Sequence, residues 1–250
     1  MAELTKNLHF LKNGIEQTAK IYTTASEAGS NYITVKVDGT TGYVPIGDIG
    51  NINATMGMVN KSGNTYTILY SKLPSLIRTT ATPLSVARKD LAATSVGDYA
   101  LFGGGSYKDI VDAYDTSLTR TTATPLSVPR SFLATTTVGN YALFGGGSNQ
   151  TTIDAYDASL TRTTATPLSA GRSYLAATTV GDYALFGGGM RSDYSSTVDA
   201  YNTSLIRTIP TPLSAGRSYL AATTVGDYAL FGGGYNRSTY SNIVDAYTIS

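Results

Sequence analysis

The sequence predicts an all-β protein in which a four-bladed β-propeller follows a small β-sandwich or barrel. One observation is a Tyr-Ala-Leu-Phe-Gly-Gly-Gly segment that occurs four times, with its phenylalanines at 102, 144, 186 and 231, so the periods are 42, 42 and 45 residues. The other is that each period holds four short strand-like runs and almost no helix pattern. Four strands in just over 40 residues are typical of a propeller blade.

The first seventy residues predict three β-hairpins. Alternating runs at 8–12 and 17–22 flank Asn13-Gly14, runs at 32–37 and 42–46 flank Asp38-Gly39, and runs at 56–60 and 65–69 flank Ser62-Gly63. Asn-Gly and Asp-Gly between such runs are strong hairpin signals. We therefore expect a small β-domain at 1–70, a linker at 71–74 and the propeller at 75–250.

The strands of one blade can be placed in the third repeat. A run at 175–180 follows an arginine, and Gly181-Asp182 makes a tight turn to the run at 183–186, which three glycines close. The third run is at 197–201. A fourth type of run, such as 159–164, alternates and is β-branched, as suits a half-exposed strand.

The repeat region begins with a run of the fourth type, 76–80, and ends with one of the third type, 243–247. Pairing these two runs would complete the last blade and close a four-bladed ring within one chain, which removes an exposed sheet edge. Two alternatives stay open. Two chains could form an eight-bladed ring as a homo-oligomer, or the blades could stack openly.

The repeat resembles the kelch repeat. Pro129-Arg130-Ser131, the aromatic-apolar run 139–146 with its double glycine, and Tyr156 follow the kelch order, and the resemblance recurs over about 175 residues. It implies a kelch-like β-propeller. Two departures are evident: kelch propellers usually have five to seven blades, and the kelch tryptophan is missing. Its approximate place is taken by Arg78, Arg120, Arg162 and Arg207.

The N-terminal segment resembles a small module of prophage and phage structural proteins from Gram-positive bacteria, through residues 4–10 and 43–47. The resemblance implies a virion component that attaches to other virion proteins through residues 1–70. The N-terminus lacks a basic region followed by an apolar stretch, so we expect synthesis in the bacterial cytoplasm without a signal peptide. The expected final location is the virion surface, on the head, tail or baseplate.

Composition excludes several kinds of site. Eighteen Lys and Arg against seventeen Asp and Glu give a net charge of +1, which argues against nucleic-acid binding. The chain has no cysteine and one histidine, which excludes thiolate nucleophiles, Cys-ligated metals and sites that need two histidines. No long apolar run predicts a membrane span. We therefore predict no cofactor, no metal and no catalytic residue.

The candidate binding residues lie in the loops between the second and third strands of each blade. The framework is nearly copied between blades, but these loops vary and are rich in Tyr, Asn, Ser and Arg, the residue types that binding loops favour. The predicted ligand-binding residues are Tyr107, Lys108, Asn149, Gln150, Arg191, Asp193, Tyr194, Tyr235, Asn236, Arg237 and Tyr240.

One arginine begins each blade and would lie near the propeller axis: Arg88, Arg130, Arg172 and Arg217. A ring of four guanidinium groups could bind an anion, but the favoured interpretation is structural, with each arginine paired to a repeat aspartate or to backbone carbonyls. The second arginine set, at 78, 120, 162 and 207, is predicted to form a solvated stripe on the outermost strand.

Together these observations predict a non-enzymatic virion protein whose propeller binds a host surface receptor or glycan, as in a tail fibre or baseplate appendage. One alternative is a capsid or tail decoration protein with no receptor role. Others are a kelch-type sugar mutarotase and an intracellular interaction adaptor.

Overall fold

The computed structural model describes residues 78–249 and the strands of the first 77 residues. Backbone contacts divide the chain into two units, Met1–Thr79 and Thr80–Ser250, which we describe separately. The division falls a few residues after the predicted linker at 71–74. No helix long and apolar enough to cross a membrane occurs in the described part.

Three hairpins make up the described part of the N-terminal unit. Strand β1 (Asn7–Lys12) pairs with β2 (Ile15–Lys20), β3 (Tyr32–Val37) with β4 (Thr40–Pro45), and β5 (Met56–Val59) with β6 (Thr65–Ile68). The first two pairs have the antiparallel register that the predicted two-residue turns require, because Lys12 pairs with Ile15 and Val37 with Thr40. In the third pair Val59 pairs with Thr65, so five residues connect the strands instead of two. The described strands form three separate two-stranded sheets, so the expected single sandwich or barrel is not evident among them.

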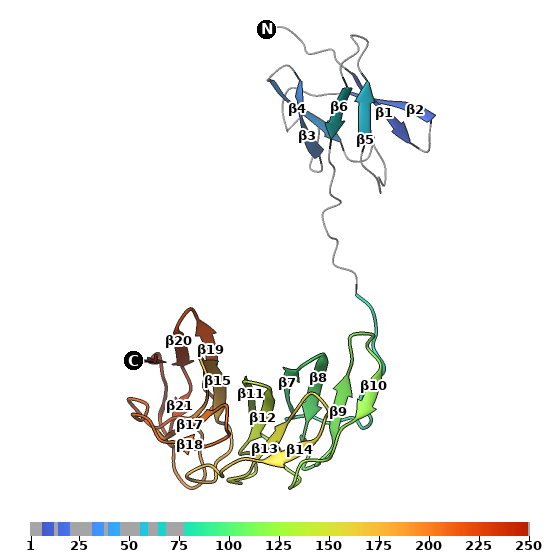
Figure 1. Cartoon of the computed structure of the whole chain (residues 1–250). Helices are drawn as coiled ribbons and strands as arrows, with labels where there is room; N and C mark the ends of the chain where they lie inside the picture. Colours follow the sequence, from blue (N-terminus) through green and yellow to red (C-terminus); the bar gives the residue numbers. More distant parts are fainter. Residues whose placement is uncertain are drawn as a thin grey trace. The chain divides into compact units, whose positions relative to one another are not determined.

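Four antiparallel sheets make up the repeat unit, which confirms the prediction of an all-β chain with repeated sheets (Figure 1). The first three sheets have four strands each, and their strands are β7 (Ala92–Val96), β8 (Tyr99–Gly103), β9 (Val111–Tyr114) and β10 (Arg120–Thr122); β11 (Ala134–Val138), β12 (Tyr141–Gly145), β13 (Ile153–Tyr156) and β14 (Arg162–Thr164); and β15 (Ala176–Val180), β16 (Tyr183–Gly187), β17 (Val198–Asn202) and β18 (Arg207–Thr208). The fourth sheet holds β19 (Ala221–Val225), β20 (Tyr228–Gly232) and β23 (Val244–Tyr247), and a hairpin of β21 (Tyr235–Asn236) and β22 (Thr239–Tyr240) precedes β23.

The innermost strands β7, β11, β15 and β19 lie next to one another, so the sheets fan out from them (Figure 1). Threonine side chains join these strands. The hydroxyls of Thr136 and Thr179 are 2.7 Å apart, and those of Thr178 and Thr224 are 2.8 Å apart. Threonine therefore serves both as a β-branched strand former and as the polar link between neighbouring sheets.

The core lies between sheets, where the phenylalanines of the second, third and fourth sheets each pack against a glycine of the preceding sheet. A Cβ added to Gly103 would lie 2.5 Å from the ring of Phe144, and one added to Gly145 would lie 2.5 Å from Phe186. The glycine that directly follows the phenylalanine in the first three Tyr-Ala-Leu-Phe-Gly runs is thus required because a phenylalanine ring of the next sheet lies against it, and not because of turn geometry. Both phenylalanines are fully buried.

The predicted closure of a four-bladed ring within one chain is not found, and this corrects the sequence-based expectation. Strand β23 pairs only with β20, so the fourth sheet has three strands. Residues 78–80 form no strand, and 76–77 lie outside the described residues. The sheet-to-sheet packing repeats with little change, and three such contacts leave the first and last sheets at opposite ends of an arc (Figure 1).

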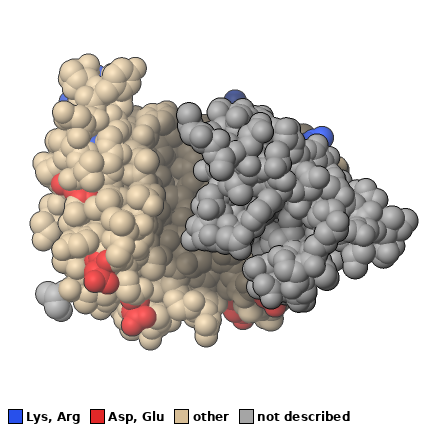
Figure 2. Space-filling view, turned by 90° about the horizontal axis from the view of Figure 1, so that it is seen from above, with Lys and Arg blue, Asp and Glu red and all other residues tan. Residues whose placement is uncertain are grey.

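Charged side chains are sparse on the described part of the face that Figure 2 shows. Figure 2 shows isolated acidic groups and few basic ones on the described part of one face, with no band of Lys and Arg. A surface of this kind lacks the positive field that draws in phosphate backbones.

Candidate functional site

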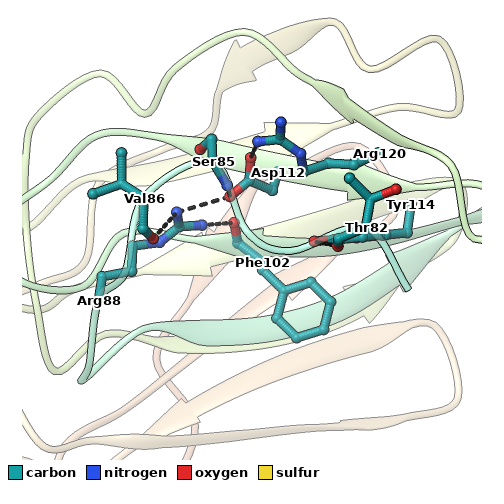
Figure 3. Close-up of polar contacts among 8 residues, drawn as sticks. All are labelled: Thr82, Ser85, Val86, Arg88, Phe102, Asp112, Tyr114 and Arg120. Carbon is teal, nitrogen blue, oxygen red and sulfur yellow. Dashed lines mark hydrogen bonds and ion pairs between the residues drawn. The ribbon is translucent and has the colours of Figure 1, made fainter. Parts of the chain in front are cut away.

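A buried cluster of two arginines and one aspartate recurs in the sheets. In the first sheet, Arg88 precedes β7, and its Nη1 lies 2.8 Å from Oδ2 of Asp112 on β9 (Figure 3). The other oxygen, Oδ1, lies 3.2 Å from Nη1 of Arg120 on β10. Arg88 also donates from Nη2 to the Phe102 carbonyl at 2.8 Å. The Asp112 carboxylate on β9 therefore joins the segment before β7, which carries Arg88, to β10, which carries Arg120.

The second and third sheets repeat this cluster. Asp154 lies 2.8 Å from Arg130 and 3.0 Å from Arg162, and Asp199 lies 2.6 Å from Arg172 and 3.7 Å from Arg207. In the fourth sheet Arg217 lies 2.5 Å from Asp245. The buried charges are thus paired, as low-dielectric surroundings require.

The Asp112 carboxylate shows how the cluster holds its charge. Burial on its own raises the pKa of Asp112, but hydrogen bonds from Ser85 and Arg88 outweigh it, so the pKa lies below the ordinary value. The Ser85 backbone N–H donates to Oδ2 at 3.2 Å. A carboxylate held ionised between two arginines is a poor general base, because its affinity for protons is reduced.

These contacts decide where the predicted axial arginines lie. The side chains of Arg88, Arg130, Arg172 and Arg217 are at most 1% exposed, and each pairs with the aspartate of its own sheet. They are held within the sheets and do not form a ring of free guanidinium groups. The outer set differs from expectation: Arg120, Arg162 and Arg207 are about a quarter exposed and face the same aspartates, so they are not a solvated stripe.

The loops of the third and fourth sheets come together in one cluster on the surface, which we term the tyrosine cluster. The rings of Tyr194 and Tyr235 meet edge to face at 5.7 Å, and Tyr235 lies 5.8 Å from Tyr240, which is 90% exposed. Arg237 and Asp193 form an exposed ion pair of 2.9 Å across the two loops. Five of the predicted binding residues thus form one continuous surface.

Two further predicted residues lie beside the tyrosine cluster. Arg191 is exposed, and its backbone N–H donates to the Asp193 carbonyl at 3.3 Å. Asn236 lies in β21, where its Oδ1 accepts a hydrogen bond from Thr239 Oγ1 at 3.1 Å. Both residues therefore shape the loops that carry the cluster.

The loops of the first two sheets bind their own neighbours instead. The Tyr107 backbone N–H donates to Ser131 Oγ at 2.8 Å, and the Lys108 carbonyl accepts from Arg130 N. The Asn149 N–H donates to Ser173 Oγ at 3.0 Å, and Gln150 N–H donates to the Gly147 carbonyl. Among residues 78–249, no hydrogen bond, ion pair or ring contact joins these four residues to the tyrosine cluster.

Sequence reasoning missed a column of aromatic rings at the entry to the innermost strands. Phe132 lies 4.4 Å from Tyr174, which stacks on Tyr219 at 4.3 Å. All three have positive φ, between 56° and 60°, an uncommon conformation for such residues. Burial and a hydrogen bond with Tyr219 raise the pKa of Tyr174 to about 12. Aromatic residues at the repeat spacing were the signal that could have revealed this column.

The innermost strands line an open depression of about 510 Å³. Its lining residues are alanine, threonine and serine from β7, β11, β15 and β19, with Ala100 of β8, and none of them is charged. A second cavity of about 530 Å³ lies between the hairpin ends of the first two sheets. Within the described part of the chain, no group of three His, Asp or Glu side chains could hold a metal ion.

Comparisons with known proteins add no assignment. No protein-family model matches the chain, and the search of curated proteins found no match. The kelch and virion resemblances therefore rest on the residues quoted above.

Proposed function

We propose that this chain is a non-enzymatic virion protein that recognises a carbohydrate or protein of the bacterial host surface through the tyrosine cluster. The observation that carries the proposal is that cluster itself: Tyr194, Tyr235 and Tyr240 beside the exposed Arg237–Asp193 pair. In the proposal, residues 1–70 attach the chain to other virion proteins.

The chemistry of the cluster suits recognition rather than catalysis. Tyrosine rings give a large, rigid and amphipathic contact area, and a charged pair at the edge can exchange its partner for ligand hydroxyls. The buried aspartates already have arginine partners, so among the described residues we assign no acid or base to a reaction. The repeated sheets provide a stiff support for variable loops, which is the usual arrangement of binding sites.

The proposal is tested by binding to whole cells and to purified envelope polysaccharide of Gram-positive bacteria. We expect the full chain to bind and Tyr194→Ala with Arg237→Ala to weaken binding about tenfold or more, as for interface hot spots. Ile209→Ala is the matched control, because Ile209 is 58% exposed and belongs to none of the predicted loops.

Two results would contradict this assignment. Full binding by the Tyr194→Ala/Arg237→Ala variant, together with loss in Tyr107→Ala, would move the site to the first sheet. No binding to any envelope fraction, with the protein present in purified phage particles by mass spectrometry, would favour a decoration protein without a receptor role.

A further inference from the structure

The two ends of the arc carry the two halves of an interface that the chain forms three times internally. Inside the arc, a Cβ on Gly103, Gly145 or Gly187 would lie 2.5–2.7 Å from the phenylalanine ring of the following sheet. At the last sheet the equivalent glycine, Gly232, is open, because the nearest atom to an added Cβ is Val244 Cγ2 at 3.5 Å. At the first sheet Phe102 is the matching ring, and it is partly exposed.

The apolar residues around this glycine show the same difference. Val138 and Val180 are 2% and 5% exposed, whereas the equivalent Val225 is 60% exposed. Val198 is fully buried, whereas the equivalent Val244 is 60% exposed. The outer face of the last sheet is therefore an uncovered copy of surfaces that the other sheets bury.

Backbone hydrogen bonds point to the same missing neighbour. Gly105, Gly147 and Gly189 each donate at 2.9 Å to the carbonyl of the arginine that begins the following sheet. Gly234 makes no such bond in the described part, and Arg88, which begins the first sheet, receives none at its carbonyl.

The ion pairs also indicate that the last sheet lacks a neighbour. Asp112, Asp154 and Asp199 each face two arginines and are fully buried, whereas Asp245 pairs with Arg217 alone and its side chain is 17% exposed. Arg78 precedes Arg88 by the spacing that separates Arg120 from Arg130. It is exposed and has no ion-pair partner among the described residues.

We propose that a second copy of this chain docks end to end, with Phe102 of one copy on Gly232 of the other. In the same contact, residues 78–80 of one copy add the missing fourth strand beside β23 of the other, which brings Arg78 to Asp245. Propellers have about four to eight blades, so a ring of whole four-sheet chains has four or eight. Because one chain does not close, two chains form an eight-sheet ring with two identical junctions.

The proposed junction differs from the internal ones in its charge and in its aromatic residues. Lys89 and Asp90 occupy the places of Ser131 and Phe132 in the second sheet, so the aromatic column does not continue from Tyr219. The junction is accordingly more polar than the internal contacts. We expect the assembly to respond to salt more than the folded sheets do.

The mass of the full chain by light scattering at micromolar concentration tests the docking. We expect twice the chain mass of 26.2 kDa. Gly232→Gln has room in the isolated chain but blocks Phe102, so it should give the single-chain mass without loss of β-sheet circular dichroism. Ile209→Gln, on an exposed residue away from both faces, should keep the double mass. A single-chain mass for the parent protein would overturn the proposal.

A disulfide distinguishes two copies from closure within one chain. Thr121 faces Ala113 across β10 and β9, so Thr79 should face Ala246 of the other copy. Because the chain has no cysteine, Thr79→Cys with Ala246→Cys gives a clean readout on a non-reducing gel. We expect linked dimers from the double variant and none from either single variant. An internally linked monomer, a ladder of longer products or no link would each overturn the proposal.

Discussion

The Asp154 cluster gives the sharpest test of what holds the sheets together. Asp154 has no exposed surface and forms ion pairs with Arg130 and Arg162 at 2.8 and 3.0 Å. Replacing it with asparagine keeps the side-chain volume and removes the charge. Arg162 is 26% exposed and can regain water, but Arg130 is fully buried and would stay charged without a counter-ion.

The expected magnitude follows from that difference. Breaking a buried ion pair by removing one partner costs about 3–5 kcal/mol. This is a large share of the roughly 5–15 kcal/mol that separates folded from unfolded domains. The exposed pair Arg237–Asp193 sets the contrast, because pairs of that kind contribute about 0–1 kcal/mol.

The assay is urea unfolding of the full chain, followed by circular dichroism, for Asp154→Asn and the matched control Asp193→Asn. We expect the first variant to lose about 3–5 kcal/mol and the second less than about 1 kcal/mol. Equal stability of the two variants would refute the reasoning that a buried, doubly paired carboxylate orders each sheet.

Three further predictions concern packing and pH. Phe186→Ala, at a fully buried ring that packs on Gly145, should cost about 3–5 kcal/mol in urea unfolding; a cost below about 1 kcal/mol would contradict the packing of this phenylalanine on a glycine of the preceding sheet. The depressed pKa of Asp112 gives stability that is present above pH 3.8 and is lost as pH falls through the folded-state value, so thermal melting should drop in acid. Asp112→Asn should show a smaller drop than the parent protein, since Asp115 and Asp157, whose pKa values are also lowered, still titrate there; an unchanged drop would contradict this. Burial raises the pKa of Tyr247 and of Tyr174 to about 12. The neutral hydroxyls of these two residues therefore stabilise the folded chain below pH 10, and this stability is lost as pH rises towards 12. An ultraviolet titration in which all tyrosines ionise near pH 10 would contradict this.

Much of the fold could be predicted from sequence because it is repetitive and local. The turns at Gly97, Gly139, Gly181 and Gly226 all have φ near +50°, and each joins two strands at the predicted place. The glycine runs and the period of the phenylalanines fixed the sheet count. Strand pairing between neighbours in sequence depends on short-range patterns, which a single chain displays directly.

Closure and side-chain partners could not be predicted in the same way. Whether four sheets close into a ring depends on the angle between neighbouring sheets where a phenylalanine packs on a glycine. No residue pattern in the sequence predicts that angle. Arg120 and Arg162 looked like an exposed stripe, but a long side chain can turn back over its strand to a buried aspartate. The tyrosine cluster depends on how two loops of different sheets meet. Its residues could be predicted from the sequence as loop residues, but not that they lie together.

Hydrogen–deuterium exchange of the full chain, with and without purified Gram-positive envelope polysaccharide, tests the proposed recognition site most directly. The account predicts slower exchange at 190–196 and 235–241, the loops that carry the tyrosine cluster, and no change at the hairpin turns around Gly139 and Gly181. Protection confined to those hairpin turns, or no protection anywhere, would contradict it.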